Sequence, residues 1–223
     1  MSIIHRTTMA PTKLELLTPW LPAQPWYRGS GDEPVLSRTG GFRLDDPQGE
    51  VGIEFMVTTD ESGGRPVSYH IPLTYRAAPL EGAEEGLIGT SEHGVLGKRW
   101  IYDGTHDPVL VAELLALLQG RAEPQAQSVS DTPDPSVTAR FDGVPLATGV
   151  VSATVTSGPD DTRVTVDTTG SPSAGRLTIQ VTRVLEPGGT GPADAAGHVT
   201  AGWHSPDGGE ARAVFAALSN TGI

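Results

Sequence analysis

Residues 67–75 alternate strictly between apolar and polar positions. The apolar members are Val67, Tyr69, Ile71, Leu73 and Tyr75, and the members between them are Ser68, His70, Pro72 and Thr74. A period of two is typical of a β-strand with one buried face, and Pro72 favours an edge or bulge position because proline lacks an amide donor. A second β-rich run, from Val51 to Thr58, precedes this strand, and turn residues 60–64 lie between the two. We therefore predict that the two runs form an antiparallel hairpin.

A three-to-four-residue period replaces this alternation after residue 107. Val111, Leu114, Leu115 and Leu118 would share one helical face. Asp107 can cap the first turn, proline fits the next position, and Gly120 fits the position after the last turn, so we predict a helix over about 107–119. A third strand is expected over 94–102. The predicted fold of this half is α+β, an antiparallel sheet packed against a helix.

A polar segment over residues 123–135 contains three prolines and several acids, which predicts a linker or surface loop. It would separate a first domain, 1–122, from a second β-rich module, 136–223. The second module has strand-like runs over 147–156, 163–168, 177–185 and 198–203, and residues 209–218 have helical composition. Both halves contain a hairpin, a strand ending in Trp and an Asp-Gly turn, which leaves a degenerate internal repeat open.

Charge and composition exclude several classes of function. With 27 acids and 15 bases, the formal net charge of −12 argues against nucleic acid and anionic membrane as partners. The chain has no cysteine, so it has no disulfide and no zinc-thiolate site. The first residues show no leader pattern and no apolar run reaches 18 residues, so we expect a cytoplasmic protein.

Two motifs resemble the N-terminal cap domain of actinobacterial maltokinases and related glucosamine kinases. One is the leucine-rich start followed by W-L-P-A-Q-P-W-Y over residues 20–27, and the other is Y-D-G-T-H-D-P over 102–108 with the helix after it. The resemblance covers about 12–120 and implies a cystatin-like domain, a curved antiparallel sheet against a helix, that sits on a kinase. Motifs of the kinase itself are missing, because His93-Gly94 is followed by Val95 and Gly97-Lys98 by Arg99. We therefore expect a cap without its kinase, and no cofactor.

Other catalytic arrangements are weaker alternatives. His93 and His106 beside acids do not have metal-ligand spacing, and we expect no metal site. The segment 89–93 has His where a nucleophile elbow needs Gly. Paired acids, as at Asp45-Asp46, lie in turn-like sequence and are typical of solvated loops.

Aromatic side chains are the main binding candidates, since Trp and Tyr anchor interfaces and stack on sugars. The interface candidates are Trp20, Trp26, Tyr27, Trp100 and His106, and the anion-binding candidates are His70, Arg76 and Arg99.

Two hypotheses follow. The first is a non-catalytic accessory protein of maltose, α-glucan or amino-sugar metabolism that binds a sugar kinase or an α-glucan enzyme, with edge strands that also permit a homodimer. The second is a protein or enzyme that binds a sugar or sugar phosphate in a pocket between sheet and helix.

Overall fold

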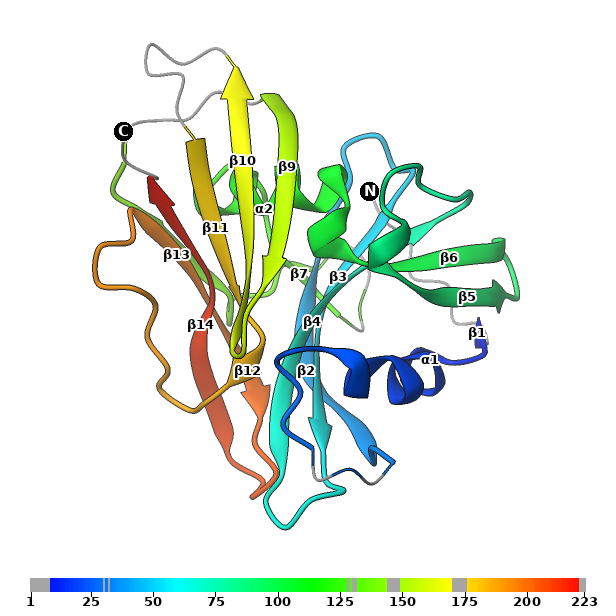
Figure 1. The fold of residues 1–223 in the computed structure, drawn as a ribbon. Coiled ribbons are helices and arrows are strands. Elements are labelled where there is room, and N and C mark those ends of the chain that lie inside the picture. Colours follow the sequence, from blue (N-terminus) through cyan, green and yellow to red (C-terminus); the bar gives the residue numbers. More distant parts are fainter. Residues whose placement is uncertain are drawn as a thin grey trace.

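The strands form one antiparallel sheet that bends around a buried helix (Figure 1). The computed structural model describes residues 9–29, 31, 33–127, 129, 132–143, 149–169 and 176–220. Over these residues the strand order is β1-β5-β6-β4-β3-β2-β13-β14-β11-β10-β9, with β7, β8 and β12 attached beside that path. The protein is therefore mostly antiparallel sheet with two short α-helices, as the α+β prediction expected in its coarse form.

The first half contains six strands and both α-helices. Its strands are β1 Met9–Ala10, β2 Leu36–Asp45, β3 Gly52–Asp60, β4 Val67–Arg76, β5 Leu87–His93 and β6 Gly97–Asp103. The α-helices are α1 Lys13–Trp20 and α2 Pro108–Leu118, and the 3-10 turns are η1 Leu21–Ala23, η2 Glu84–Gly86 and η3 Gly104–His106. The predicted hairpin is confirmed as the antiparallel pair β3–β4, and the third predicted strand is confirmed as β6. The sequence analysis did not predict α1, β2 or β5.

Helix α2 begins as the sequence predicts, with the Asp107 side chain accepting the amide of Val109 and Pro108 at the first position. Gly120 follows the helix with a φ of 68°, the left-handed conformation that glycine adopts without strain. The predicted face is confirmed, because Val111, Leu114, Leu115 and Leu118 are all buried. It lies between strands of the first half and strands of the second, and its opposite face, with Val109, Ala112 and Glu113, is partly exposed (Figure 1).

The two α-helices cover opposite faces of the first-half strands. Ile53, Phe55 and Val57 of β3 pack with α2 in one buried cluster. Met56, between two of them, packs in a second cluster with Leu17 of α1. Since neighbouring residues of a strand point to opposite faces, β3 and β4 are buried on both sides.

In its described residues, the second half contains strands and no helix. Its strands are β8 Thr138–Phe141, β9 Gly149–Ser157, β10 Asp161–Thr169, β11 Arg176–Thr182, β12 Val184–Leu185, β13 Gly197–His204 and β14 Glu210–Asn220. The four predicted strand runs are confirmed as β9, β10, β11 with β12, and β13, except that residues 147 and 148 of the first run lie outside the described residues. The predicted helix over 209–218 is wrong, because these residues form β14 between β13 and β11. The Asp207-Gly208 turn closes a hairpin in which His204 faces Glu210, so this turn leads into a strand. The corresponding Asp103-Gly104 turn of the first half leads into helix α2.

Two strand pairings join the halves into a continuous sheet. Trp203 of β13 pairs with Gly40 of β2, and β12 pairs with Tyr69 and Ser68 of β4. The segment expected to be a linker contributes β7, Gln125–Ala126, which pairs with β2. A single buried cluster then contains residues of α2 and of both halves.

Pro72 occupies an edge-like position inside a central strand. The outer side of β4 pairs with β12 up to Tyr69 and with β6 from Leu73 onward. The amide of His70 donates to Arg183 of the β12 segment, and alternate amides of a strand point to the same side. The nitrogen of Pro72 therefore faces the interval between the two partner strands, where no ladder hydrogen bond is lost.

Candidate functional site

The Asp-Gly-Thr-His-Asp-Pro motif lies where the two halves meet. Its first member, Asp103, accepts hydrogen bonds from the amide and hydroxyl of Thr105, which fixes η3. The carboxylate of Asp103 also accepts a hydrogen bond from Arg183 Nη2 at 2.5 Å. Arg183 comes from the second half, is 0% exposed, and donates through Nε to the hydroxyl of Thr162. This part of the motif joins the halves and is closed to solvent.

Asp107, in the same motif, caps helix α2 and also forms an ion pair with an arginine. Its carboxylate accepts from Arg76 Nε at 2.6 Å and from Arg76 Nη2 at 2.7 Å. The Asp107 side chain is fully buried, and bidentate pairs of this kind are strong and directional. The predicted anion-binding Arg76 is thus occupied by a carboxylate of the protein itself.

His70, another anion-binding candidate, is fully buried between aromatic rings. Its ring lies 4.5 Å from that of Phe215, centroid to centroid, and its Nδ1 donates to the carbonyl of Thr182 at 2.9 Å. Burial, reinforced by the positive charge of Arg183, lowers the pKa of His70 to about 3. The third candidate, Arg99, lies on β6 opposite Ser91 of β5. The structure places the three candidates in three different environments.

The aromatic candidates of the first motif gather around Tyr69. The Trp26 ring lies 5.7 Å from the Tyr69 ring and 5.8 Å from the Trp20 ring, and the Tyr27 ring lies 5.8 Å from the Tyr69 ring. Trp26 is 1% exposed and the Arg183 guanidinium lies over its ring at 5.1 Å. Trp20 and Tyr27 are half-buried, so only the margin of this cluster can reach a ligand or a partner.

Tyr27 is also tied to the fold through its hydroxyl, which donates to Asp60 at 2.9 Å. Burial, followed by this hydrogen bond to a carboxylate, raises the pKa of Tyr27 to about 12. Trp100 lies apart from the cluster on β6, half-buried, with the Lys98 ammonium 5.0 Å from its ring.

A buried carboxylate under α1 forms a second polar cluster. Glu54 accepts hydrogen bonds from Lys13 at 2.5 Å, from the Tyr75 hydroxyl and from the Gln127 amide. Burial alone would raise the pKa of Glu54, but the charge of Lys13 and these three hydrogen bonds outweigh it and lower the pKa. Burial and the neighbouring carboxylate raise the pKa of Tyr75. The cluster is saturated by its own members, which is typical of a structural role.

His106 lies in a small hollow beside the start of α2. The hollow has a volume of about 460 Å³ and lies between η3 and residues 152–155 of β9, with Glu81 and Glu85 at its margin. It is the nearest feature in the described residues to the expected pocket between sheet and helix.

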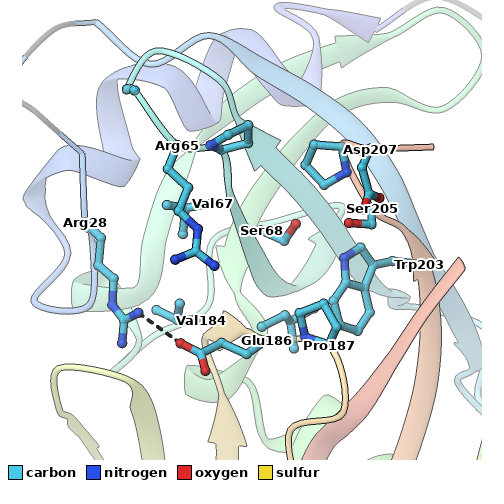
Figure 2. A pocket seen from close by; sticks show the side chains of 15 residues that line it. Arg28, Arg65, Val67, Ser68, Val184, Glu186, Pro187, Trp203, Ser205 and Asp207 are labelled. Atoms are coloured by element: carbon cyan, nitrogen blue, oxygen red, sulfur yellow. Dashed lines mark hydrogen bonds and ion pairs between the residues drawn. The ribbon is translucent and has the colours of Figure 1, made fainter. Parts of the chain in front are cut away.

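The larger cavity is an open groove at the junction of the halves, which we call the seam groove (Figure 2). It has a volume of about 1020 Å³ and is formed by four segments: the loop after η1 at Arg28, the β3–β4 turn, β12 with the residues after it, and the β13–β14 turn. Its lining residues are Arg28, Gly63, Gly64, Arg65, Pro66, Val67, Ser68, Val184, Leu185, Glu186, Pro187, Trp203, Ser205, Pro206 and Asp207.

The side chains of the seam groove combine charges of both signs with apolar surface. Arg28 forms ion pairs with Asp160 at 2.5 Å and with Glu186 at 3.5 Å. Arg65 is exposed, and no described residue forms an ion pair with it. Asp207, on the opposite wall, accepts the amide of Gly209, which lowers the pKa of its carboxyl.

None of the residues in the seam groove was a candidate from the sequence. They come from four segments that are distant in the sequence, and turns rich in Gly, Pro, Ser and charged residues look alike whether or not they line a cavity. The sequence did contain one signal for this site: Arg28 and Arg65 are two of the few basic residues of the chain.

Metal and membrane features were also sought. In the part of the chain that the structure describes, no three His, Cys, Asp or Glu side chains lie close enough together to hold a metal ion. Neither α1 nor α2 has the length and apolar character to span a bilayer, and no other α-helix occurs in the described ranges.

Comparison with known proteins finds a similarity in the first half. A comparison with curated proteins gave no match. The model of the maltokinase N-terminal cap domain matches residues 20–107, from the end of α1 through β2–β6 to the cap of α2. The match begins and ends within the two motifs that carried the resemblance, while α2 and the second half follow it. Residues 20–107 are therefore similar to the maltokinase N-terminal cap domain.

Proposed function

We propose that this protein is a non-catalytic accessory protein of maltose, α-glucan or amino-sugar metabolism, whose cap segment binds a sugar kinase or an α-glucan enzyme. The observation that carries the proposal is the cap match over residues 20–107. The cystatin-like arrangement implied by the resemblance, a curved sheet against one helix, is part of the same proposal.

The contacts of the cap motif support a scaffolding role for it. Asp103 and Asp107, the two acids of the motif, are buried and hold Arg183 and Arg76. Both carboxylates are therefore used by the fold and are not presented to a substrate.

The β5–β6 hairpin offers the cap a surface for a partner. Val95 is 62% exposed and Leu96 is 45% exposed at its turn, and Leu87 is exposed on β5. Neighbouring exposed aliphatic side chains of this kind mark interaction sites more often than isolated ones do. We place the partner contact at this hairpin.

The seam groove favours a second candidate function, a protein that binds a small molecule. Its volume of about 1020 Å³ is at the upper end of the range usual for ligand sites, roughly 300–1000 Å³. The groove lies outside the β5–β6 hairpin, so both activities can belong to one protein.

The test is binding to a purified maltokinase catalytic region that lacks its own cap. We expect a complex in size-exclusion chromatography with light scattering, and a change in the kinase's kcat/KM. The double variant Val95→Ser/Leu96→Ser should lose the complex and keep its Tm. Val35→Ser, which changes an equally exposed valine in another part of the molecule, is the matched control.

Two results would overturn the proposal. One is the absence of a complex with sugar kinases and with α-glucan enzymes alike. The other is turnover of a sugar or sugar phosphate by the purified protein alone.

A further inference from the structure

The seam groove exists only because the second half folds back onto the cap. It is lined by the β3–β4 turn of the cap, by the β13–β14 turn of the second half, and by Val184 and Leu185 of β12. The groove is open to solvent and is lined by the ends of two hairpins. Such a shape suits a chain-like ligand better than a compact one.

Charges in the groove balance. Arg28 and Arg65 supply two positive charges, and Glu186 and Asp207 supply two negative charges. A strongly anionic ligand would meet two carboxylates, and a cationic ligand would meet two guanidinium groups. The groove therefore favours a neutral ligand that can both accept from arginine and donate to carboxylates, as vicinal hydroxyl groups do.

Most of the remaining lining is apolar, with Ser68 and Ser205 as its polar members. Pro66, Pro187 and Pro206 stand at the walls, and Trp203 closes the floor with only 4% of its surface exposed. Proline rings and an indole edge present flat C–H surface at little entropic cost. Flat apolar surface beside hydrogen-bonding charges matches the two kinds of surface on a sugar ring.

Two glycines at the rim point to the close approach of a ligand. A Cβ at Gly64 would meet nothing within 4 Å, and one at Gly63 would meet only a backbone oxygen at 3.7 Å. Neither residue has a positive φ, so neither the backbone nor the packing of the protein requires glycine there. Glycine is favoured where a ligand comes close to the main chain.

We propose that the seam groove binds a neutral oligosaccharide chain, with the two arginines and two carboxylates holding its hydroxyl groups. This class of ligand follows from the groove. The choice of α-linked glucose as the sugar unit rests on the proposed function.

The test measures binding of the purified full chain by isothermal titration calorimetry to maltoheptaose, to cellohexaose and to inorganic phosphate. Gly64→Leu fills the groove without strain, and Arg65→Gln removes an unpaired donor. Ala78→Leu and Arg121→Gln make the same changes at exposed positions outside the groove. We expect maltoheptaose to bind, both groove variants to weaken binding about tenfold or more, and both controls to leave it unchanged.

Each outcome has a defined meaning, provided that all variants keep the Tm of the parent protein. Failure of both sugars to bind at millimolar concentration, or equal binding by parent and groove variants, overturns the inference. Binding of phosphate alone also overturns it. Binding of cellohexaose without maltoheptaose supports a saccharide groove and contradicts the α-glucan link, whereas failure to bind the kinase leaves the groove result untouched.

Discussion

Arg183 Nη2 lies 2.5 Å from Asp103 Oδ2, although 80 positions separate the two residues. Their side chains are 0% and 6% exposed, so the pair is removed from water. Asp103 closes the cap strand β6, and Arg183 follows β11 of the second half. The cap segment and the second half therefore share one buried ion pair, and neither half satisfies its charge without the other.

Removing one member of this pair should destabilise the whole protein. We expect Arg183→Met to lower the free energy of unfolding by about 3–5 kcal/mol, because the Asp103 carboxylate stays buried without its partner. Urea denaturation followed by far-UV circular dichroism measures the change. Arg140→Met removes an exposed pair with Asp142 and should cost less than about 1 kcal/mol. Equal losses for the two variants would contradict a special role for the buried pair.

Acid should weaken the fold through His70 before the carboxylates titrate. The pKa of His70 is lowered from 6.5 to about 3 by burial and by Arg183, so the unfolded chain binds more protons between these values. Stability is therefore full above pH 6.5 and falls, by about 1.4 kcal/mol per pH unit inside the window, as the pH drops toward 3. The carboxylate of Glu54, whose pKa is lowered from 4.5, adds its own loss only below about pH 4.5.

His70→Gln tests this assignment. The variant removes the titrating group and should flatten the dependence of unfolding free energy on pH between 6.5 and 5. His204→Gln, at an exposed position, should keep the parent's slope. A slope that survives in His70→Gln would assign the acid sensitivity to another group.

The elements that the sequence predicted correctly are those defined by local patterns, such as capping residues or strict alternation. Asp107, Pro108 and Gly120 define the limits of α2 by capping, and the strict alternation of residues 67–75 defines β4. Both features depend on neighbours in the sequence. Such elements can be predicted without knowing the rest of the fold.

The error at β14 has a tertiary cause. Its sequence is rich in alanine, which favours a helix locally, but β11 and β13 pair with it from either side. A signal was present in its first residues, since Ala211, Ala213 and Phe215 are buried and Arg212 is exposed. The seam groove and the Arg183 contact depend on the pairing of distant strands. No local pattern in the sequence specifies that pairing.

Trp26 should behave as a core residue and Trp20 as a marginal one. We expect Trp26→Ala to lower the free energy of unfolding by about 3–5 kcal/mol, because a ring in contact with Tyr69 and Arg183 leaves a cavity. Trp20→Ala should cost less than half as much, since that side chain is only half-buried. Chemical denaturation of both variants decides this, and a mild effect of Trp26→Ala would return Trp26 to the set of exposed binding candidates.

Asp107 combines two roles that two substitutions can separate. Asp107→Ala removes the cap of α2 and the partner of Arg76, and should lower the free energy of unfolding by about 3–5 kcal/mol. Asp107→Asn keeps an oxygen that can cap the helix, which is worth about 1 kcal/mol, and gives up only the charge. We therefore expect Asn to fall between Asp and Ala in urea denaturation. If Asn and Ala are equally destabilising, the ion pair with Arg76 accounts for the whole effect and the cap contributes nothing measurable.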